Sequence, residues 1–158
     1  MTNLQNLTFI IARAQADYAR CIDDDRLEQW PDFFVEDCLY KITTADSQRD
    51  GLEAGIVFAN TRAMLRDRIS ALREANIYEK QAYRHVLGMP CVLDENAGGV
   101  RSETAFFVVR IMRDGTSDLF ATGRYLDHYE IQNETALLKE RIVVCDSSRI
   151  DTLLAIPL

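Results

Sequence analysis

Apolar residues recur every three or four positions in two parts of the chain, a spacing that is typical of one face of an α-helix. The first run predicts a long helix with an inner face formed by Leu7, Ile10, Ile11, Ala14, Tyr18, Cys21 and Ile22. The second run predicts a helix over about 59–75, with an inner face formed by Leu65, Ile69 and Leu72. Arg62 and Arg66 lie off that face, and we expect them to be solvated.

A run of three aspartates, at 23–25, separates the first helix from a short aromatic segment. We expect one of these aspartates to cap a second, short helix, because its side chain can accept a hydrogen bond from a free backbone N–H. Pro31 fits the first turn of that helix, where a missing N–H costs little. The apolar face consists of Leu27, Trp30, Phe33 and Phe34. We expect these aromatic rings to lie in the core, although they could also line the mouth of a pocket.

Alternating apolar and polar residues predict β-strands in most of the remaining chain. The expected strands are 38–43, 83–93, 104–112, 119–131 and 137–145. Pro90 indicates an edge or a bulge in the second of these, because proline cannot donate to a β-ladder. The third strand is apolar on both faces, so we expect both of its sides to be covered.

Polar and turn-forming residues separate these strands. Segments 44–54 and 94–99 are predicted to be loops. Asp114-Gly115 predicts a hairpin turn, because glycine accepts a positive φ, and the last two strands are expected to join near Asn133. Segment 153–158 is unusually apolar, so we expect it to dock against another surface.

Helices come first in this order and a run of strands follows, which indicates the α+β class. We expect one domain over residues 1–158, with the helices packed on a strongly curved antiparallel sheet that closes into a cone. A chain of 158 residues is long enough to bury a core of its own. The interior of such a cone can hold either an active site or packed side chains.

The chain carries a net charge of −7, with 25 acidic and 18 basic side chains. A protein that binds duplex nucleic acid needs a basic face, so nucleic acid is a poor candidate for a partner. No apolar run approaches the roughly 20 residues that span a bilayer, and no secretory leader is evident at the N-terminus. These features predict a cytoplasmic protein that does not bind a membrane.

Metal and nucleotide sites find little support in the residue pattern. The four cysteines lie within apolar patterns and form no C-x-x-C pair, so we expect them to be reduced core residues: Cys21, Cys38, Cys91 and Cys145. The chain has only two histidines, and neither lies close in sequence to a cysteine or to the other histidine, which argues against a zinc or iron–sulfur site. No glycine-rich phosphate loop and no G-x-S-x-G motif occurs.

One catalytic arrangement stays open, in which a histidine acts as a general base inside the cone. His85 or His128 would be that base, with Asp37, Asp127 or Tyr40 as its partner. The alternative is a strand histidine that bonds a backbone carbonyl or a carboxylate for structural reasons. Asp127 and His128 are neighbours on one strand and point to opposite faces, so simple alternation does not place these two in one pocket.

Several segments, in this order and spacing, resemble the small (β) subunits of aromatic-ring-hydroxylating oxygenases. They are 28–34 (EQWPDFF), 37–40 (DCLY), 64–69 (MLRDRI), 83–88 (YRHVLG), and Asp146 with 153–158 (LLAIPL). Within that family, 51–57 and 68–79 are most similar to the branch that acts on terephthalate, followed by branches that act on salicylate or other benzoates. Together these segments cover nearly the whole chain.

The resemblance implies a cone of the nuclear-transport-factor-2 and scytalone-dehydratase type. It implies assembly with a large (α) subunit, usually three of each (α3β3), and a mainly structural role for the small subunit. The large subunit would carry the [2Fe–2S] Rieske cluster and the mononuclear Fe(II), and a separate reductase or ferredoxin would bring electrons from NAD(P)H. No catalytic, cofactor-binding or metal-binding residue is expected in this chain.

Residue type and position suggest where this chain would meet its partner. Arginine is enriched at protein interfaces and forms bidentate pairs with carboxylates. The candidate interface residues lie on the second long helix and on the strand after it: Arg68, Arg73, Tyr83, Arg84 and His85. For Arg84, an ion pair at a subunit boundary and one inside the chain are both open. The alternative functions are a stand-alone dehydratase or isomerase, and a ligand-binding protein of the same cone fold.

Overall fold

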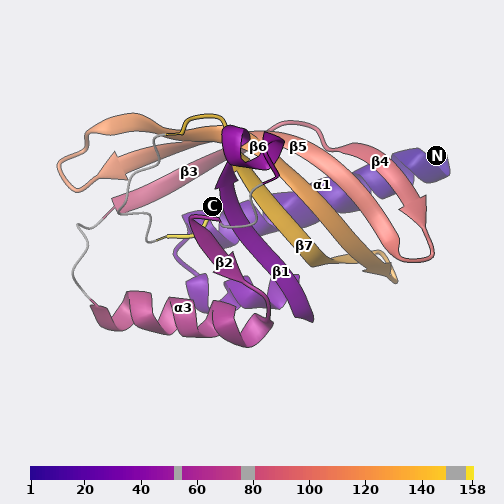
Figure 1. Cartoon of the computed structure of the whole chain (residues 1–158), viewed down its shortest axis with the longest axis horizontal. Coiled ribbons are helices and arrows are strands. Elements are labelled where there is room, and N and C mark those ends of the chain that lie inside the picture. Colours follow the sequence, from indigo (N-terminus) through magenta and orange to yellow (C-terminus); the bar gives the residue numbers. More distant parts are fainter. Residues whose placement is uncertain (52–54, 76–80, 149–155) are drawn as a thin grey trace.

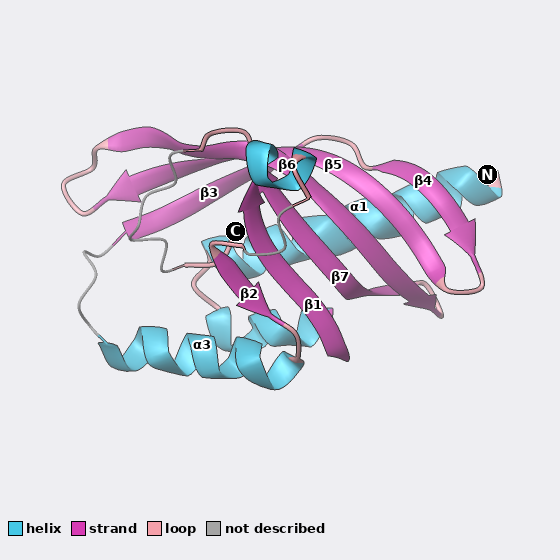
Figure 2. Cartoon of the chain, viewed as in Figure 1, coloured by secondary structure: helices cyan, strands magenta, loops and turns pink. Residues whose placement is uncertain are grey.

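The structure is a computed structural model that describes residues 1–51, 55–75, 81–148 and 156–158 (Figures 1 and 2). Its helices are α1 (Asn3–Asp23), the 3-10 helix η1 (Leu27–Phe33), α2 (Ala45–Arg49) and α3 (Arg62–Ala75). Its strands are β1 (Phe34–Thr44), β2 (Val57–Ala59), β3 (Gln81–Leu87), β4 (Cys91–Asn96), β5 (Gly99–Met112), β6 (Ser117–Gln132) and β7 (Thr135–Cys145). Both long helices and the five predicted strand regions are present.

The first helix forms as its apolar pattern predicts. Thr2 caps α1 by accepting a hydrogen bond from the Gln5 backbone N–H, and the Gln5 side chain accepts one from the Thr2 backbone N–H. Its inward stripe is buried except for the partly exposed Ala14, and it also contains a buried polar residue, Gln15. Figure 1 shows α1 running behind the strands, so that it covers one face of the sheet.

The short aromatic helix differs from the prediction in its start and its type. It is a 3-10 helix, its N-cap residue is Arg26, and no side chain caps it. Pro31 is inside the helix, near its C-terminal end, and not in its first turn. The aromatic residues do lie in the core: Trp30 and Phe34 are fully buried, and Phe33 packs against them in part.

The segment between β1 and α3 is more structured than a loop. Thr44 caps the short helix α2 by accepting a hydrogen bond from Ser47, and β2 then pairs antiparallel with β1. Helix α3 begins at Arg62, a few residues later than predicted. Arg62 is not solvated as expected, because its guanidinium donates to the Phe34 carbonyl and to the Glu36 carboxylate, at 2.9 Å each.

The sheet is mixed, which corrects the prediction of an antiparallel one. Its strand order is β2-β1-β7-β6-β5-β3, and β4 also pairs with β5. The pairing of β1 with β7 is parallel, and the other described pairings are antiparallel. The sheet curls around α1, so the α+β cone is present with one parallel joint.

The region around Pro90 contains two strands in line along one edge of β5. β3 pairs with 106–112 and β4 with 99–103, and the residues around Pro90 lie between them. Proline therefore marks an edge, as predicted. The loop expected over 94–99 is wrong, because β4 runs on to Asn96 and a tight turn leads directly into β5.

Strand β5 has one buried face and one face that this chain leaves partly open. Val100, Phe106 and Val108 point inward and are buried, whereas Ala105 and Phe107 are exposed on the other face. The expectation that both faces are covered is therefore wrong for the isolated chain.

The two long hairpins form where their turn residues predict. Gly115 has a φ of +88° in the β5–β6 turn, which glycine adopts without strain. Asn133 and Glu134 have φ values of +50° and +63° and form the β6–β7 turn. These turns connect β5, β6 and β7, the long strands that form the wall of the cone.

The described end of the apolar tail docks inside the same chain. Ile156, Pro157 and Leu158 are buried, and residues 153–155 lie outside the described part. The Leu158 backbone N–H donates to the Tyr40 hydroxyl, and the Leu158 backbone oxygen accepts from Tyr18 and Tyr40. The docking expected from the apolar pattern is thus intramolecular for these three residues.

Candidate functional site

A histidine–carboxylate pair lies between the end of α1 and the inner face of β3. Asp23 is the last residue of α1, and His85 lies on the same face of β3 as Tyr83. The His85 Nδ1 atom is 2.7 Å from Asp23 Oδ1, and the His85 backbone N–H donates to Asp23 Oδ2 at 2.9 Å. The His85 side chain is 0% exposed and the Asp23 side chain is 3% exposed. Arg84 adds a looser ion pair to Asp23, at 3.8 Å.

The second ring nitrogen of His85 has no hydrogen-bond partner among the described residues. Because Nδ1 faces a carboxylate, we assign the ring proton to Nδ1, which leaves the lone pair of Nε2 as a buried acceptor. The surroundings are aromatic: the Tyr83 ring centroid is 6.1 Å from the His85 ring and 5.2 Å from the Phe120 ring. This is the arrangement of a general base, a buried imidazole oriented by a carboxylate.

A second polar group fills the middle of the cone. Arg141 donates to both carboxylate oxygens of Asp127, from Nε and Nη2, at 2.8 Å each, and neither side chain is exposed. The guanidinium lies between the rings of Tyr18 and Tyr125, 4.2 and 3.8 Å from their centroids. Gln15 donates to Asp127 Oδ2 at 3.2 Å. Side chains, rather than an open cavity, occupy this part of the interior.

The pKa values of this group follow from its burial and its charges. Burial alone would lower the pKa of the Arg141 guanidinium, but the Asp127 carboxylate and the neighbouring tyrosine hydroxyls together outweigh that effect and raise the pKa, so Arg141 stays charged. Burial raises the pKa of the Tyr125 hydroxyl well above its ordinary value. The tyrosines around Arg141 therefore stay neutral, and the Arg141–Asp127 pair carries no net charge.

None of the histidine pairs considered from sequence forms. His85 pairs with Asp23 instead of Asp37, Asp127 or Tyr40, and Asp37 is exposed. His128 lies on the outer face, opposite in direction to Asp127, as alternation predicts. Partial burial, then the nearby Arg101 and Lys139, lower the pKa of the His128 imidazole.

Asp23 is the residue of this candidate site that sequence reasoning missed. The sequence pattern indicates a helix cap for the aspartate run, yet the Asp23 side chain contacts His85 on β3, 62 residues away in sequence. Only the pairing of α1 with β3 in three dimensions shows this contact. Gln15 was likewise hidden within an apolar helical stripe.

The structure separates the candidate interface residues. Tyr83 and His85 are buried within the chain, and Arg73 forms ion pairs with Asp25 and Glu28 at 3.0 and 2.7 Å. Arg68 is half-buried on α3. Arg84, with a side chain that is 65% exposed, remains available at the surface beside its contact with Asp23.

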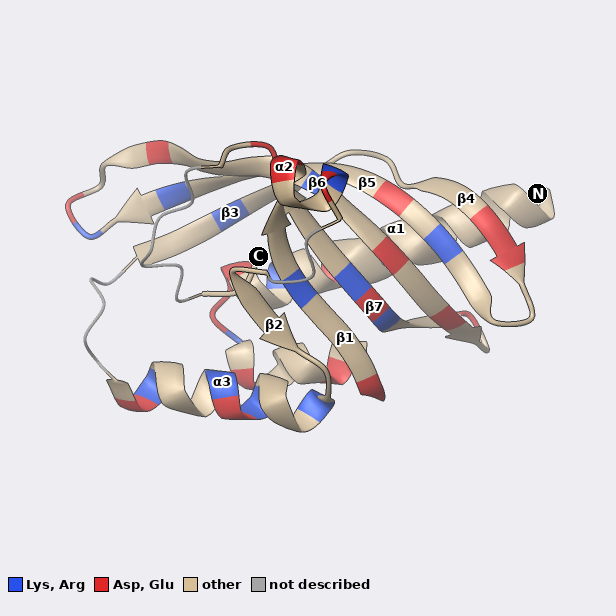
Figure 3. Ribbon diagram, in the orientation of Figure 1, with Lys and Arg blue, Asp and Glu red and all other residues tan. Residues whose placement is uncertain are grey.

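An apolar patch lies on the outer face of β3, β5 and β6, beside Arg84. This outer apolar patch consists of Val86, Phe107 and Leu119, which are 44%, 40% and 63% exposed. Val86 and Phe107 face each other across the β3–β5 pair. Elsewhere, basic and acidic residues are interspersed along the helices and strands (Figure 3).

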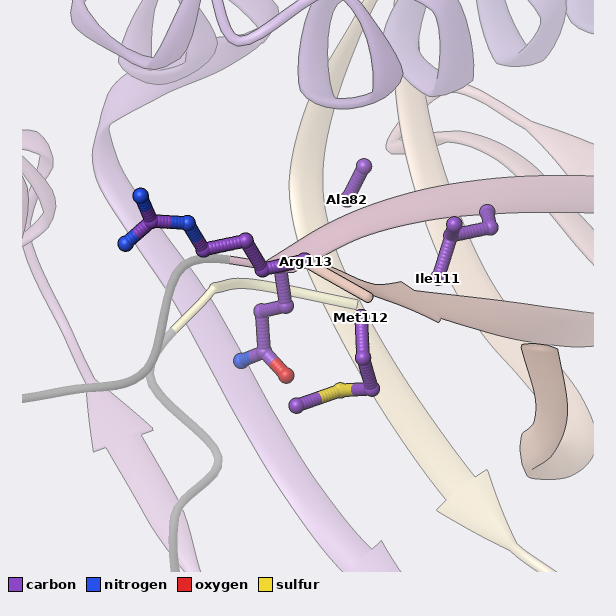
Figure 4. Close-up of a pocket in the computed structure, with 5 residues that line it drawn as sticks. Ala82, Ile111, Met112 and Arg113 are labelled. Carbon is purple, nitrogen blue, oxygen red and sulfur yellow. The ribbon is translucent and has the colours of Figure 1, made fainter. Parts of the chain in front are cut away.

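A groove of about 530 Å³ lies at the free end of the β3–β5 pair. Its lining residues are Gln81, Ala82, Ile111, Met112 and Arg113. Figure 4 shows Ala82 and Ile111 on one side of the strands and Met112 on the other. The groove is one step along the inner face of β3 from Tyr83.

Metal ligands do not gather anywhere in the described residues, because no group of three His, Cys, Asp or Glu side chains could hold an ion there. All four cysteines are free. Three are buried as expected, whereas Cys91 is exposed on β4, which corrects its prediction as a core residue. In the part of the chain that the structure describes, no helix combines the length and the apolar character needed to cross a bilayer.

Sequence comparison relates the chain to dioxygenase subunits. Residues 17–152 match the model of a family described as ring hydroxylating beta subunits. The chain is 50% identical over 148 residues to terephthalate 1,2-dioxygenase, terminal oxygenase component subunit beta 1, from a Comamonas species, which covers 94% of this chain and 96% of that protein. It is 37% identical to the anthranilate 1,2-dioxygenase small subunit of Burkholderia cepacia, with 98% and 100% of the two chains covered.

Comparison of structures agrees with these relationships. The β subunit of an aromatic-ring-hydroxylating dioxygenase from Novosphingobium aromaticivorans superposes with a TM-score of 0.89 at 36% identity, over 98% of both chains. A scytalone dehydratase from the same species superposes with a TM-score of 0.68 at 16% identity, over 93% of this chain and 89% of that one. The second likeness shows the fold alone, and it confirms the predicted scytalone-dehydratase type of cone.

Proposed function

The chain belongs to the family of ring-hydroxylating β subunits, and from this premise we propose that it is the structural small subunit of a Rieske-type oxygenase for an aromatic carboxylate. Members of this family are components of oxidoreductase complexes. The large subunit would carry the [2Fe–2S] cluster and the mononuclear Fe(II), in an assembly of three large and three small subunits. A separate reductase or ferredoxin would deliver electrons from NAD(P)H.

The observation that carries this proposal is the 50% identity to a terephthalate 1,2-dioxygenase β subunit over 94% of the chain. The next relative named above belongs to an anthranilate dioxygenase, and both named substrates are aromatic carboxylates. Terephthalate is therefore the first candidate substrate, and salicylate or another benzoate is the second.

The close packing around Arg141 favours a structural role over an independent catalytic one. The Arg141–Asp127 pair and its flanking tyrosines fill the middle of the cone with packed side chains. Chemistry on the aromatic ring is then left to the large subunit. Holding several large subunits together would let electrons pass between neighbouring metal centres.

We propose that the large subunit covers the outer apolar patch and Arg84. Three exposed large apolar side chains gather on one sheet face, and exposed apolar patches are typical of protein–protein contacts. Arg84 supplies a cation at the rim for a carboxylate of that partner. The other candidate interface residues would support this contact indirectly, because they hold α3 and β3 in place: Arg68, Arg73, Tyr83 and His85.

Co-expression tests the assembly role. The large subunit is purified with and without this chain, its molar mass is measured by light scattering, and NADH-driven oxidation of terephthalate is assayed with the reductase. We expect the large subunit alone to lose both its defined oligomeric state and most of its activity. If mass and turnover are the same without this chain, the proposal is wrong.

A further inference from the structure

We propose that the cone contains a binding site for a small uncharged aromatic alcohol, whose hydroxyl donates a hydrogen bond to Nε2 of His85. The site consists of the Asp23–His85 pair and the rings of Tyr83 and Phe120. It is separate from the outer apolar patch and does not depend on assembly with a large subunit.

The unpaired acceptor is the first reason. Asp23 engages Nδ1 and the backbone N–H of His85, which fixes the ring and leaves the Nε2 lone pair buried without a donor among the described residues. A buried polar atom without a partner costs about 1–3 kcal/mol. A ligand that brings a donor to Nε2 recovers that cost.

The charges around the ring select the kind of donor. The Asp23 carboxylate, 2.7 Å from Nδ1, repels a second anion, and a carboxylate ligand has no proton to donate. The nearby cations are already paired: Arg84 with Asp23 at 3.8 Å, and Arg110, which lies 4.9 Å from the Phe120 centroid, with Asp118 at 3.0 Å. A neutral hydroxyl therefore suits the site, whereas a benzoate-type carboxylate does not.

The aromatic rings and the groove supply the rest of the site. Gln81, Tyr83 and His85 alternate along one face of β3, so the Tyr83 ring lies between the groove and His85. Rotation of that ring would connect the groove of about 530 Å³ to the pair. A six-membered ring that enters there would lie among apolar and aromatic side chains.

Nuclear magnetic resonance of the full chain labelled with nitrogen-15 in its histidines tests this inference. The chain has only two histidines, so His128 on the outer face is an internal control. We expect the spectrum to show a proton on Nδ1 of His85, and phenol to shift the Nε2 signal in a saturable manner. Benzoate should leave that signal in place, and phenol should not move the His128 signals.

Ligand and variant series measure the contribution of the hydrogen bond. Benzene, which lacks the hydroxyl, should bind at least about tenfold more weakly than phenol. His85→Phe should lose the same factor for phenol, whereas His128→Phe should not. A proton on Nε2 in the free chain, equal responses to phenol and benzoate, or no response to phenol would each overturn the inference. A chain that fails these tests but still assembles normally leaves the proposed function intact.

Discussion

Arg141 is a full positive charge inside the cone, and its position there depends on how completely its neighbours satisfy it. Asp127 neutralises it through two hydrogen bonds, and Tyr18 and Tyr125 cover both faces of the guanidinium. A buried ion pair of this kind contributes little net stability, because desolvation offsets the attraction. Removal of only one of the two charged side chains is costly, because the remaining buried charge is left without a partner.

Arg141→Met is therefore expected to lower the free energy of unfolding by about 3–5 kcal/mol, because it leaves Asp127 buried and unpaired. The double variant Asp127→Leu/Arg141→Met should lose less than the sum of the two single variants. Urea unfolding followed by circular dichroism measures all three. Arg49→Ala, which breaks the exposed pair with Asp46, is the control and should change stability by less than about 1 kcal/mol. Strictly additive losses would contradict the coupling.

The cysteines should differ sharply in reactivity. Burial, with a smaller contribution from Asp146, raises the pKa of the Cys145 thiol to about 12, and burial also raises the pKa values of Cys21 and Cys38. These three thiols stay protonated at pH 8 and are poor nucleophiles. We expect iodoacetamide at pH 8 to alkylate the exposed Cys91 first, as read by peptide mass spectrometry. The other three should react only after denaturation, and equal rates for Cys91 and Cys145 would contradict this expectation.

Single-residue chemistry was only partly predictable from sequence. His85 could be singled out as a possible base because it is one of two histidines and lies on a strand. Its partner could not be found, because alternation and helical periodicity relate only residues that are close along the chain. Asp23 and His85 meet through the packing of α1 on β3, and the sequence does not contain that information in readable form.

At the scale of elements, the docked end of the tail ties α1 and β1 together. Tyr18 comes from α1 and Tyr40 from β1, and both hydroxyls donate to the backbone oxygen of Leu158. Tyr40 has a second role, since its hydroxyl also accepts from the Leu158 backbone N–H. The two tyrosines are therefore not equivalent.

Tyr40→Phe should destabilise the chain by about 1–3 kcal/mol, because it leaves the buried Leu158 N–H without a partner. Tyr18→Phe should cost less, about 0.5–1.5 kcal/mol, since Tyr40 still donates to the same backbone oxygen. Thermal unfolding gives the overall loss, and amide hydrogen exchange at Leu158 reports whether the tail is released. Faster exchange in Tyr18→Phe than in Tyr40→Phe would show that the roles are reversed.

Elements with a strong period were predicted best. The inward stripes of α1 and α3 are long enough for the apolar spacing to be unambiguous, and glycine and asparagine mark the hairpins. Short elements were missed: β2 has only three residues and α2 five, too few to show a period. The parallel pairing of β1 with β7 was missed because strand direction depends on chain topology, not on the local pattern.

At the scale of the whole molecule, the outer apolar patch is the surface on which the assembly proposal rests. Strand β5, which carries Phe107, is predicted from its apolar pattern to be covered on both faces, and the isolated chain leaves one of them partly open. Both observations agree with the proposal that another protein covers the open face of β5.

Phe107→Glu should weaken association with the large subunit at least tenfold, because a charge would have to be buried in the contact. Phe9→Glu is the matched control, since Phe9 is 60% exposed on α1, away from the patch. Circular dichroism should show both variants folded, and co-purification with the tagged large subunit measures binding. If Phe9→Glu disrupts the complex and Phe107→Glu does not, the partner binds at α1 instead.

The parallel joint between β1 and β7 has a consequence for how the protein is made. This pairing places Tyr40 opposite Arg141. The wall of the cone therefore cannot close until β7, which comes about a hundred residues after β1 in the sequence, is available to pair with β1. During translation, one edge of β1 therefore stays without its neighbour until β7 has emerged from the ribosome. Any partner that recognises the closed cone can therefore bind only after β7 has been synthesised and has paired with β1.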